Sequence, residues 1–224
     1  LKNLHVLGTT GVGKSTLLGH LALADIEAGR GLVVIEPKGA LIDDILARIP
    51  KHRRDDVVVL DPADTLAPVG LNPLAGGHGR RPELVVDALL AVFHQLWADA
   101  WGPRTQDILH AALLTLARRP DASLVMLPLL LTNPGFRRSI TQAAVREDPV
   151  ALGSFWAWYE QLSDAERAAV IAPVMNKVRA FLLRPSMRAV VGQVAPRFTL
   201  RQVFAERKIL LVPLSKGTVG PEAA

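Results

Sequence analysis

The sequence contains no cysteine, which excludes disulfide bonds and metal sites built from thiolates. This absence fits a protein that works in a reducing cytoplasm. The six histidines show no spacing typical of metal ligands. The longest apolar run in the middle of the chain, LVMLPLLL, is too short for a transmembrane helix and contains a proline. The sequence therefore predicts neither a disulfide framework, nor a thiolate centre, nor a membrane span within this chain.

Half of the 224 residues are apolar, which is enough for a sizeable core and argues against wholesale disorder. The length suits one domain, or one domain with a large insertion. The formal net charge is +5, and arginine dominates the basic residues, so contact with nucleic acid is permitted. The chain begins at Leu1 rather than Met and ends in GPEAA. We therefore expect a segment of a longer protein.

The stretch GTTGVGKST, residues 8–16, fits the phosphate-binding pattern G-x-x-x-x-G-K-[ST]. A short apolar run at residues 4–8 predicts a strand before it, and the apolar spacing of residues 16–29 predicts a helix after it. Strand, glycine-rich loop and helix start together predict a P-loop that binds ATP. The expected ATP-binding residues are Gly8, Thr9, Thr10, Gly11, Val12, Gly13, Lys14, Ser15 and Thr16.

Each residue type in this loop suits the chemistry of a triphosphate. Backbone N–H groups of residues 10–15, together with the helix dipole, would cradle the β-phosphate. Gly11 and Gly13 permit backbone angles and a close approach that a Cβ would obstruct. Lys14 would reach the β- and γ-phosphates as the catalytic cation, and the Ser15 hydroxyl would bind Mg²⁺. ATP and Mg²⁺ are therefore the expected cofactors.

Three further apolar runs predict strands, at residues 32–35, 56–61 and 208–214, and an amphipathic helix over 40–49 follows the first. Strands that alternate with helices indicate an α/β fold with a parallel sheet and right-handed crossovers. Ligands of such sheets lie at the carboxyl ends of the strands. We therefore expect the turn that contains Glu36 and Lys38 beside the P-loop, as a second tier of contacts. The alternative for Lys38 is an ordinary solvated lysine.

From residue 82 the apolar spacing becomes helical, with further helices predicted around 124–131, 135–146, 150–162 and 164–183. No strand signal of comparable strength interrupts them. The predicted domain organisation is an N-terminal part of a P-loop ATPase core at 1–81, an all-helical insertion at 82–195 and a return to the core at 196–224.

ATP hydrolysis requires an acidic residue at the end of a second core strand, to hold Mg²⁺ and to position the attacking water. Asp61 ends one predicted strand, but Pro62 follows it where a motor ATPase usually has a second acid. The alternative role of Asp61 is to cap the turn after the strand. We expect the acidic Walker B strand beyond Ala224, so hydrolysis by this segment alone stays open.

Several residues fit both a functional and a structural role. The aromatic sequence FWAWY at 155–159 could stack on bases, but its helical spacing favours the core. Arg104 could act on a neighbouring subunit's γ-phosphate, and the preferred alternative is a surface arginine near a helix start. The basic runs at 51–54, 137–138 and 177–188 are candidate contacts for DNA phosphates, and solvated helix faces explain them nearly as well.

With these residues in view, the chain resembles the type IV secretion coupling proteins of bacterial conjugation. These TraG/TraD-like proteins belong to the HerA/FtsK group of RecA-like motor ATPases. The resemblance rests on the P-loop, IEPKGALIDDIL, VVVLDPAD leading into GLNPL, WGPRTQDILHAALLTL, RAAVIAPVMNKVRAFLLRPSMRAVVGQ, and the closing strand before LSKGTVGPEAA. Together these stretches cover most of the chain. Glu36 stands where the family usually has Asp, and Ala40 where a second acid often stands.

The resemblance implies a RecA-like core and a homo-hexameric ring that pumps DNA through a central channel, with each ATP site completed by a neighbouring subunit. The helical insertion corresponds to the family's all-α domain, which contacts DNA or the relaxase-bound substrate. Further implied partners are the relaxase, the type IV secretion channel and the membrane, through a segment outside this chain. The implied location is the cytoplasmic face of the inner membrane.

Two alternatives stay open at this point. One is a soluble DNA translocase or a secretion-assembly ATPase of the same HerA/FtsK group. The other is a nucleotide-binding module without motor activity, regulatory or scaffold-like. An apolar strand ending in Asp-Glu downstream would favour a motor, and membrane spans upstream would favour a coupling protein.

Overall fold

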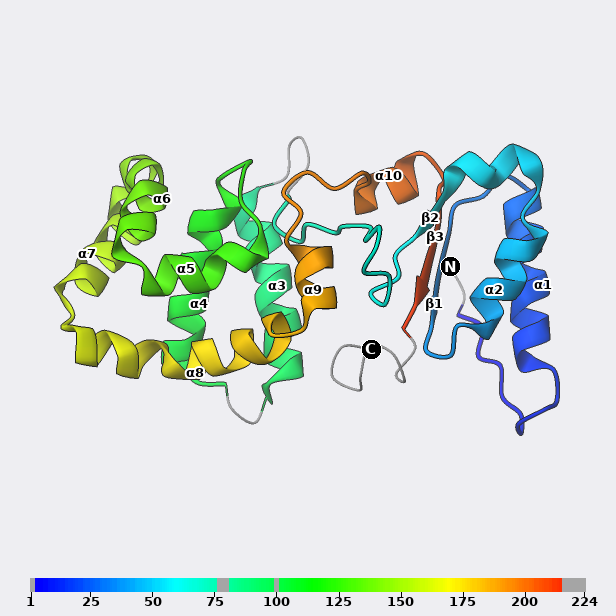
Figure 1. Ribbon diagram of the computed structural model, residues 1–224, viewed down its shortest axis with the longest axis horizontal. Coiled ribbons are helices and arrows are strands. Elements are labelled where there is room, and N and C mark those ends of the chain that lie inside the picture. The colour runs from blue at the N-terminus through cyan, green and yellow to red at the C-terminus, as the bar shows by residue number, and fades with distance from the viewer. Residues whose placement is uncertain (1–2, 76–80, 99–100, 215–224) are drawn as a thin grey trace. The chain divides into compact units, whose positions relative to one another are not determined.

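The computed structural model describes residues 3–75, 81–98 and 101–214 (Figure 1). The chain divides into two compact units. The first comprises Leu1–Val69 and Phe198–Ala224, and the second comprises Gly70–Arg197. The first unit contains a small parallel sheet with helices, whereas the described residues of the second are helical or irregular. The structure is therefore an α/β protein, as the sequence predicts.

The sheet of the first unit has three parallel strands in the order β1-β3-β2. β1 spans Leu32–Glu36, β2 spans Val57–Val59 and β3 spans Ile209–Pro213. In the register of the sheet, Leu32 of β1 and Val57 of β2 both pair with Ile209. β3 is buried from Ile209 to Val212, as expected for a central strand. The predicted return of the chain to the sheet after the helical stretch is confirmed.

α1 (Lys14–Glu27) and α2 (Ala40–Arg48) lie on the same side of this sheet (Figure 1). Ile26, Ile42 and Ile45 from these helices join Ile209 and Leu211 of β3 in one apolar cluster. Removal of such side chains from water is the main favourable term in folding. The 3-10 helix η1 (Lys51–Asp56) precedes β2, and α10 (Leu200–Ala205) precedes β3.

Arg53 is buried in this unit, although the sequence made it a candidate contact for DNA phosphates. Its guanidinium donates hydrogen bonds to the carbonyl oxygens of Ile26 at 3.2 Å, Arg30 at 3.3 Å and Arg207 at 2.7 Å. It also pairs with Asp56 at 2.8 Å. Arg53 thus ties the end of α1 to the segments that enter β1 and β3, and a role for it in DNA contact is wrong.

Two strand predictions differ from the structure. Residues 3–8 form no strand before the P-loop, and Leu4 and Leu7 are 71% and 78% exposed. A strand requires a hydrogen-bonded neighbour, and the described sheet pairs only β1, β3 and β2. The strand predicted at 56–61 is reduced to β2, because its first residue pairs with Arg53 and Asp61 caps a turn.

The second unit is built around one central helix. Its helical segments are α3 (Pro82–Leu96), α4 (Pro103–Ala117), η3 (Leu124–Met126), α5 (Leu127–Thr132), α6 (Pro134–Glu147), η4 (Pro149–Gly153), α7 (Ser154–Gln161), α8 (Asp164–Leu182) and α9 (Pro185–Val191). α4 packs against α3, α5, α6 and α8, and its residues Ile108, Leu109 and Leu113 are fully buried. Each helical range predicted from the sequence contains a helix.

Local sequence explains where these helices begin. Ser163 and Glu166 form a capping box at the start of α8: each side chain accepts a hydrogen bond from the other residue's backbone N–H. Proline is favoured in the first turn of a helix, where its missing N–H has no intrahelical partner to lose. Five α-helices in the described part of this unit carry one there: Pro82, Pro103, Pro128, Pro134 and Pro185.

The first and last parts of the second unit meet at the buried residue Asn72. Its side-chain amide donates to the carbonyl oxygens of Ala122 at 2.9 Å and Val194 at 3.0 Å. Burial of an amide is favourable only when its hydrogen bonds are satisfied, as they are here. These bonds join the segment after Gly70 to the helices, so the unit begins earlier than the boundary at residue 82 drawn from the sequence.

Candidate nucleotide-binding site

The loop before α1 has a conformation that depends on its glycines. Gly11 and Gly13 both have φ of +89°, in the left-handed region that residues with a Cβ rarely adopt. Gly8 allows a close approach, because a Cβ at this position would lie 2.7 Å from Cγ2 of Val12. Gly8, Gly11 and Gly13 therefore each meet a physical requirement of this loop, and two of them, Gly8 and Gly13, are fixed positions of the phosphate-binding pattern.

α1 begins directly after this loop without a side-chain cap. The N-cap residue is Gly13, which has no side chain that could accept a hydrogen bond from the first turn. That turn also contains no acidic residue. The first N–H groups of a helix have no intrahelical partner and carry partial positive charge. Ser15 and Thr16 are exposed in the same turn. The start of α1 is therefore open to an anion.

Lys14 folds back onto the loop. Its ammonium Nζ donates hydrogen bonds to the carbonyl oxygens of Gly8 at 2.8 Å and Thr9 at 2.6 Å. The loop thus holds one positive charge beside the N-terminus of α1. The structure brings together the residues that the sequence assigns to ATP binding, which run without interruption from Gly8 to Thr16.

A magnesium ion at this loop would depend on the nucleotide for most of its ligands. No cluster of three or more His, Asp or Glu side chains suited to a metal occurs in the described residues. The hydroxyl of Ser15 is a hard oxygen ligand, which Mg²⁺ prefers, and phosphate oxygens are of the same kind. The donor set of the loop therefore fits Mg²⁺ bound together with a triphosphate.

The turn after β1 lies at the same end of this unit as the P-loop (Figure 1). One carboxylate oxygen of Glu36 accepts a hydrogen bond from the backbone N–H of Lys38 at 3.0 Å. The other oxygen of Glu36 is buried and has no partner among the described residues. Lys38 is exposed, and Gly39 has φ of +84° at the start of α2. Glu36 therefore shapes this turn, and Lys38 is accessible to a ligand.

Asp61 stabilises the turn that follows β2. Its carboxylate accepts a hydrogen bond from the backbone N–H of Ala63 at 2.8 Å, as an Asx turn does. Asp64 does the same in the next turn, accepting from the N–H groups of Leu66 and Ala67. The structural role that the sequence offered for Asp61 is thus present.

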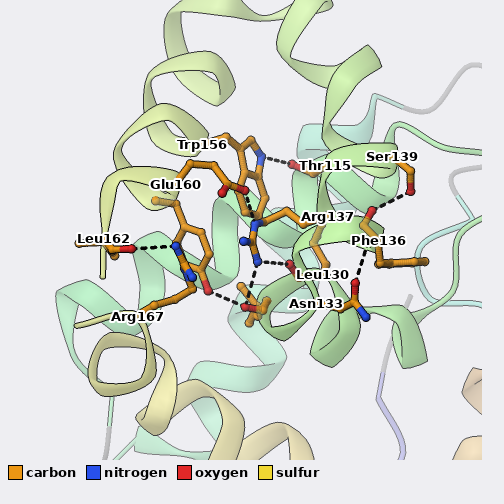
Figure 2. Close-up of polar contacts among 12 residues, drawn as sticks. Thr115, Leu130, Asn133, Phe136, Arg137, Ser139, Trp156, Glu160, Leu162 and Arg167 are labelled. Carbon is orange, nitrogen blue, oxygen red and sulfur yellow. Dashed lines mark hydrogen bonds and ion pairs between the residues drawn. The ribbon is translucent and has the colours of Figure 1, made fainter. Parts of the chain in front are cut away.

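The aromatic sequence of residues 155–159 belongs largely to the core of the helical unit. Trp156 and Tyr159 are buried, and their polar atoms are satisfied. The indole N–H of Trp156 donates to the hydroxyl of Thr115 at 2.9 Å (Figure 2), and the Tyr159 hydroxyl donates to the carbonyl of Leu131 at 2.7 Å. Burial raises the pKa of Tyr159 to about 12. The core interpretation of these two aromatics is confirmed.

Arg137 is another basic residue that the structure removes from the candidates for DNA contact. Its side chain is 1% exposed, pairs with Glu160 at 2.5 Å (Figure 2) and lies 5.0 Å from the centre of the Tyr159 ring. The hydrogen bond from Arg137 lowers the pKa of Glu160. A guanidinium that is buried and paired with Glu160 is not accessible to a DNA phosphate, so this prediction is wrong for Arg137. Arg138 beside it is exposed.

The remaining basic candidates have mixed surroundings. Arg188 donates to the carbonyl oxygens of Leu182 and Leu183, at 2.6 and 3.0 Å, and so satisfies the end of α8. Arg179 is exposed on α8, and Arg104 is exposed in the first turn of α4. The structure of the helical unit agrees with the preferred interpretation of Arg104 as a surface residue near a helix start.

Residues outside every predicted site line one cavity of the helical unit. Asp87 and His94 on α3, and Gln106 and His110 on α4, line this cavity together with Trp101. The available signal was the helical spacing that places Asp87 and His94 on one face of α3. That spacing is common on exposed helices, so it does not by itself indicate a site.

Comparison with protein-family models and with curated proteins gives no match for this chain. No helix in the described ranges is both long and apolar enough to cross a membrane.

Proposed function

We propose that this chain is the ATP-binding segment of a motor ATPase with a RecA-like core, which drives DNA translocation in conjugative transfer through a type IV secretion system. The observation that carries the proposal is the glycine-rich loop from Gly8 to Gly13, which encloses the Lys14 ammonium at the uncapped start of α1. Positive charge and open N–H groups at a helix start are the features that bind a phosphate.

The contacts of Lys14 indicate how ATP would bind. Its ammonium donates to two neutral carbonyl oxygens, and oxygens of the β- and γ-phosphates would replace them. A phosphate oxygen carries negative charge, so its contact with the ammonium gains a Coulomb attraction that a neutral carbonyl oxygen does not offer. The first N–H groups of α1 would bind the β-phosphate, and Ser15 would bind Mg²⁺, which neutralises charge that develops during phosphoryl transfer.

The sheet supports the same site. Ligands of parallel α/β sheets bind at the carboxyl ends of the strands, and the turn with Glu36 and Lys38 lies at the end of β1. We include these two residues as second-tier contacts of the nucleotide. The proposed homo-hexamer would complete each site from a neighbouring subunit, and the acid that orients the attacking water would come from outside the residues described.

The proposed substrate is DNA, and the support for it is the resemblance and the net charge of +5. The relaxase and the secretion channel are the proposed protein partners. A segment outside this chain would anchor the protein at the cytoplasmic face of the inner membrane. A soluble DNA translocase or a secretion-assembly ATPase of the same group would share the nucleotide site and differ in these partners.

A second candidate function is a nucleotide-binding module without motor activity. The observation that favours it is the carboxylate of Asp61, which caps the turn after β2 rather than standing free at the end of a strand. The described residues thus combine the glycine-rich loop before α1 with no free acid at the end of β2.

Nucleotide binding is tested by titration of this chain with ATP and Mg²⁺ in a calorimeter. Lys14→Ala removes the cation of the loop and should weaken binding by about ten- to a hundredfold, the effect of losing a hydrogen bond to a charged group. The matched control is Lys51→Ala, which removes an exposed lysine of η1. Equal affinity in the two variants would overturn the proposed site.

Motor activity is tested in the full-length protein, by ATP turnover with and without DNA. The motor proposal expects turnover that DNA stimulates and that Lys14→Ala abolishes while the fold stays intact. Binding of ATP without turnover in either condition would favour the nucleotide-binding module.

A further inference from the structure

A cavity of about 310 Å³ lies between α3 and α4, wholly within the helical unit. Its size is at the lower end of the range for small-molecule sites, which is about 300–1,000 Å³. α3 contributes Asp87 and His94, α4 contributes Gln106 and His110, and Trp101 comes from the segment that precedes α4. Polar side chains thus make up four of the seven residues in the lining, and three of them, Asp87, His94 and Gln106, are exposed, so the cavity is open to solvent.

The rings around the cavity suit a flat ligand. The imidazole of His94 and the indole of Trp101 meet edge to face, with their centres 5.3 Å apart and their planes at 77°. This contact fixes the orientation of both rings relative to each other. Leu90 and Ala91 add apolar surface from α3. A planar aromatic ring can stack on such a wall, because every aromatic heterocycle has a π-face.

The orientation of Gln106 is set by Trp101. The indole N–H of Trp101 lies 3.0 Å from Oε1 of Gln106. An indole N–H can only donate a hydrogen bond, so the atom that it meets must be the amide oxygen. The amide NH₂ group of Gln106 is left without a partner among the described residues, and it can donate to a carbonyl oxygen of a ligand.

Asp87 supplies the complementary group. It lines the same cavity, is exposed, and has neither a hydrogen bond nor an ion pair within the described part of the chain. An ionised carboxylate only accepts hydrogen bonds, and its two oxygens can accept two parallel ones. A ligand with two adjacent N–H donors would therefore satisfy Asp87.

The charge of the lining selects against anionic ligands. Neither lysine nor arginine lines the cavity among the described residues, and Asp87 is its one acidic residue. A phosphate or carboxylate group inside the cavity would lie close to this carboxylate, with no lysine or arginine among the described lining residues to compensate. The lining therefore favours a neutral or cationic group that donates hydrogen bonds.

We propose that this cavity binds a guanine base. Guanine is planar and neutral, its ring N–H and amino group are adjacent donors for Asp87, and its carbonyl oxygen is an acceptor for the NH₂ group of Gln106. The base can come from a free nucleoside or from single-stranded nucleic acid, since both present the same edge. The proposal is independent of the ATP site, which lies in the other unit of the chain.

The test is titration of this 224-residue chain with deoxyguanosine in a calorimeter, with thymidine as the reference ligand. Deoxyguanosine lacks phosphate, so it does not compete for the loop before α1. Saturable binding of deoxyguanosine and a much weaker signal with thymidine, which has no amino group, is the expected result. The variant Lys14→Ala should bind deoxyguanosine as the unchanged chain does, which separates this inference from the proposed ATP site.

Two substitutions locate the site. Asp87→Asn removes the charge and one of the two acceptors, so it should weaken deoxyguanosine binding by about tenfold or more. The matched control is Asp107→Asn, which removes an exposed carboxylate on α4 that does not line the cavity. Gln106→Ala should also weaken binding and tests the second contact independently. No saturable binding, or equal affinity in Asp87→Asn and Asp107→Asn, overturns the proposal.

Short oligonucleotides then identify the source of the base. A single-stranded (dT)₉ is compared with the same strand carrying one guanine at its centre. Tighter binding of the guanine-containing strand than of deoxyguanosine, lost in Asp87→Asn, assigns the cavity to single-stranded nucleic acid. Equal or weaker binding of the strand assigns it to the free nucleoside.

Discussion

Arg137 is buried in the helical unit, where its guanidinium has polar partners that an aliphatic side chain could not bind. Its guanidinium pairs with Glu160 and donates to the carbonyl oxygens of Leu130 and Leu131 (Figure 2), while Tyr159 lies against its face. A buried cation is stable only when such partners compensate for the water it has lost. The partner carboxylate is partly exposed, so protons reach one side of the pair from solvent.

The residue-scale prediction concerns the pH dependence of this pair. The pKa of Glu160 is lowered from its ordinary 4.5 by the hydrogen bond from Arg137, so ionised Glu160 stabilises the fold above pH 4.5. This stabilisation is lost as the pH falls through the lowered pKa. Glu160→Gln should reduce the free energy of unfolding at pH 7 by about 1 kcal/mol, since the half-exposed carboxylate is partly screened.

Urea unfolding followed by tryptophan fluorescence measures the effect, because all four tryptophans lie in the helical unit. The difference between Glu160→Gln and the unchanged chain should shrink from pH 7 to pH 3. Glu147→Gln, an exposed carboxylate near the end of α6, serves as the control. A difference that stays constant with pH would contradict the role assigned to the pair.

At the scale of single elements, α8 depends on its first turn. The helix carries a proline inside it, Pro173, which removes one backbone hydrogen bond. The capping box of Ser163 and Glu166 satisfies two of the N–H groups at its start. A helix weakened in its middle relies more on its ends and on packing.

We predict that Ser163→Ala lowers the free energy of unfolding by about 1 kcal/mol, the usual cost of losing an N-cap. Denaturant unfolding at neutral pH measures it. Ser139→Ala is the matched control, because its hydroxyl donates to the carbonyl of Phe136 within α6 and is exposed, and its effect should stay within about 0.5 kcal/mol. Equal losses in both variants would show that the cap contributes nothing specific.

Most elements could be predicted from the sequence because their signals are local. The buried strand at β3, the amphipathic helix α2 and the glycines with positive φ in the P-loop follow from apolar spacing and backbone chemistry. The strand before the P-loop could not be judged in the same way, since pairing depends on a neighbour distant in sequence. For the same reason the burial of Arg53 could not be read from the basic run that contains it.

The two candidate sites differ in the same respect, because one is local in sequence and the other is assembled from separate segments. The glycine-rich loop before α1 is continuous in sequence, so its match to the phosphate-binding pattern is visible as a motif. The cavity between α3 and α4 depends on two helices and the segment between them, and only their packing brings Asp87 close to Gln106 and Trp101. Sites assembled from separate helices leave little trace in a single sequence.

At the scale of the whole molecule, the positive charge is unevenly distributed. The segment Gly70–Arg197 contains 14 lysines and arginines against 10 aspartates and glutamates, so it carries most of the net charge of +5. Exposed members of this set include Arg138, Arg146 and Arg179. If DNA is the substrate, the helical unit is the part of the chain that we expect to contact its phosphates.

We predict that the chain binds DNA with an affinity that falls steeply as salt is added, because each neutralised phosphate releases counterions. Fluorescence anisotropy with a labelled oligonucleotide, at about 50 to 200 mM NaCl, gives the slope of log affinity against log salt concentration. Arg179→Glu should lower the affinity and flatten the slope, whereas Arg48→Glu, in the other unit, should change neither. Binding that ignores salt, or no binding at all, would remove DNA as the substrate.

The hydrogen bonds of Leu71 and Asn72 bear on whether the helical unit can be removed or transplanted as a separate module. The N–H of Leu71 donates to the carbonyl of Val190 at 3.0 Å, so the chain enters and leaves this unit at adjacent points. An inserted module with neighbouring ends imposes little closure entropy on its host. Replacement of Gly70–Arg197 by a short glycine–serine linker should therefore leave the first unit able to fold. The excised segment, inserted into a loop of an unrelated carrier protein, should fold as well.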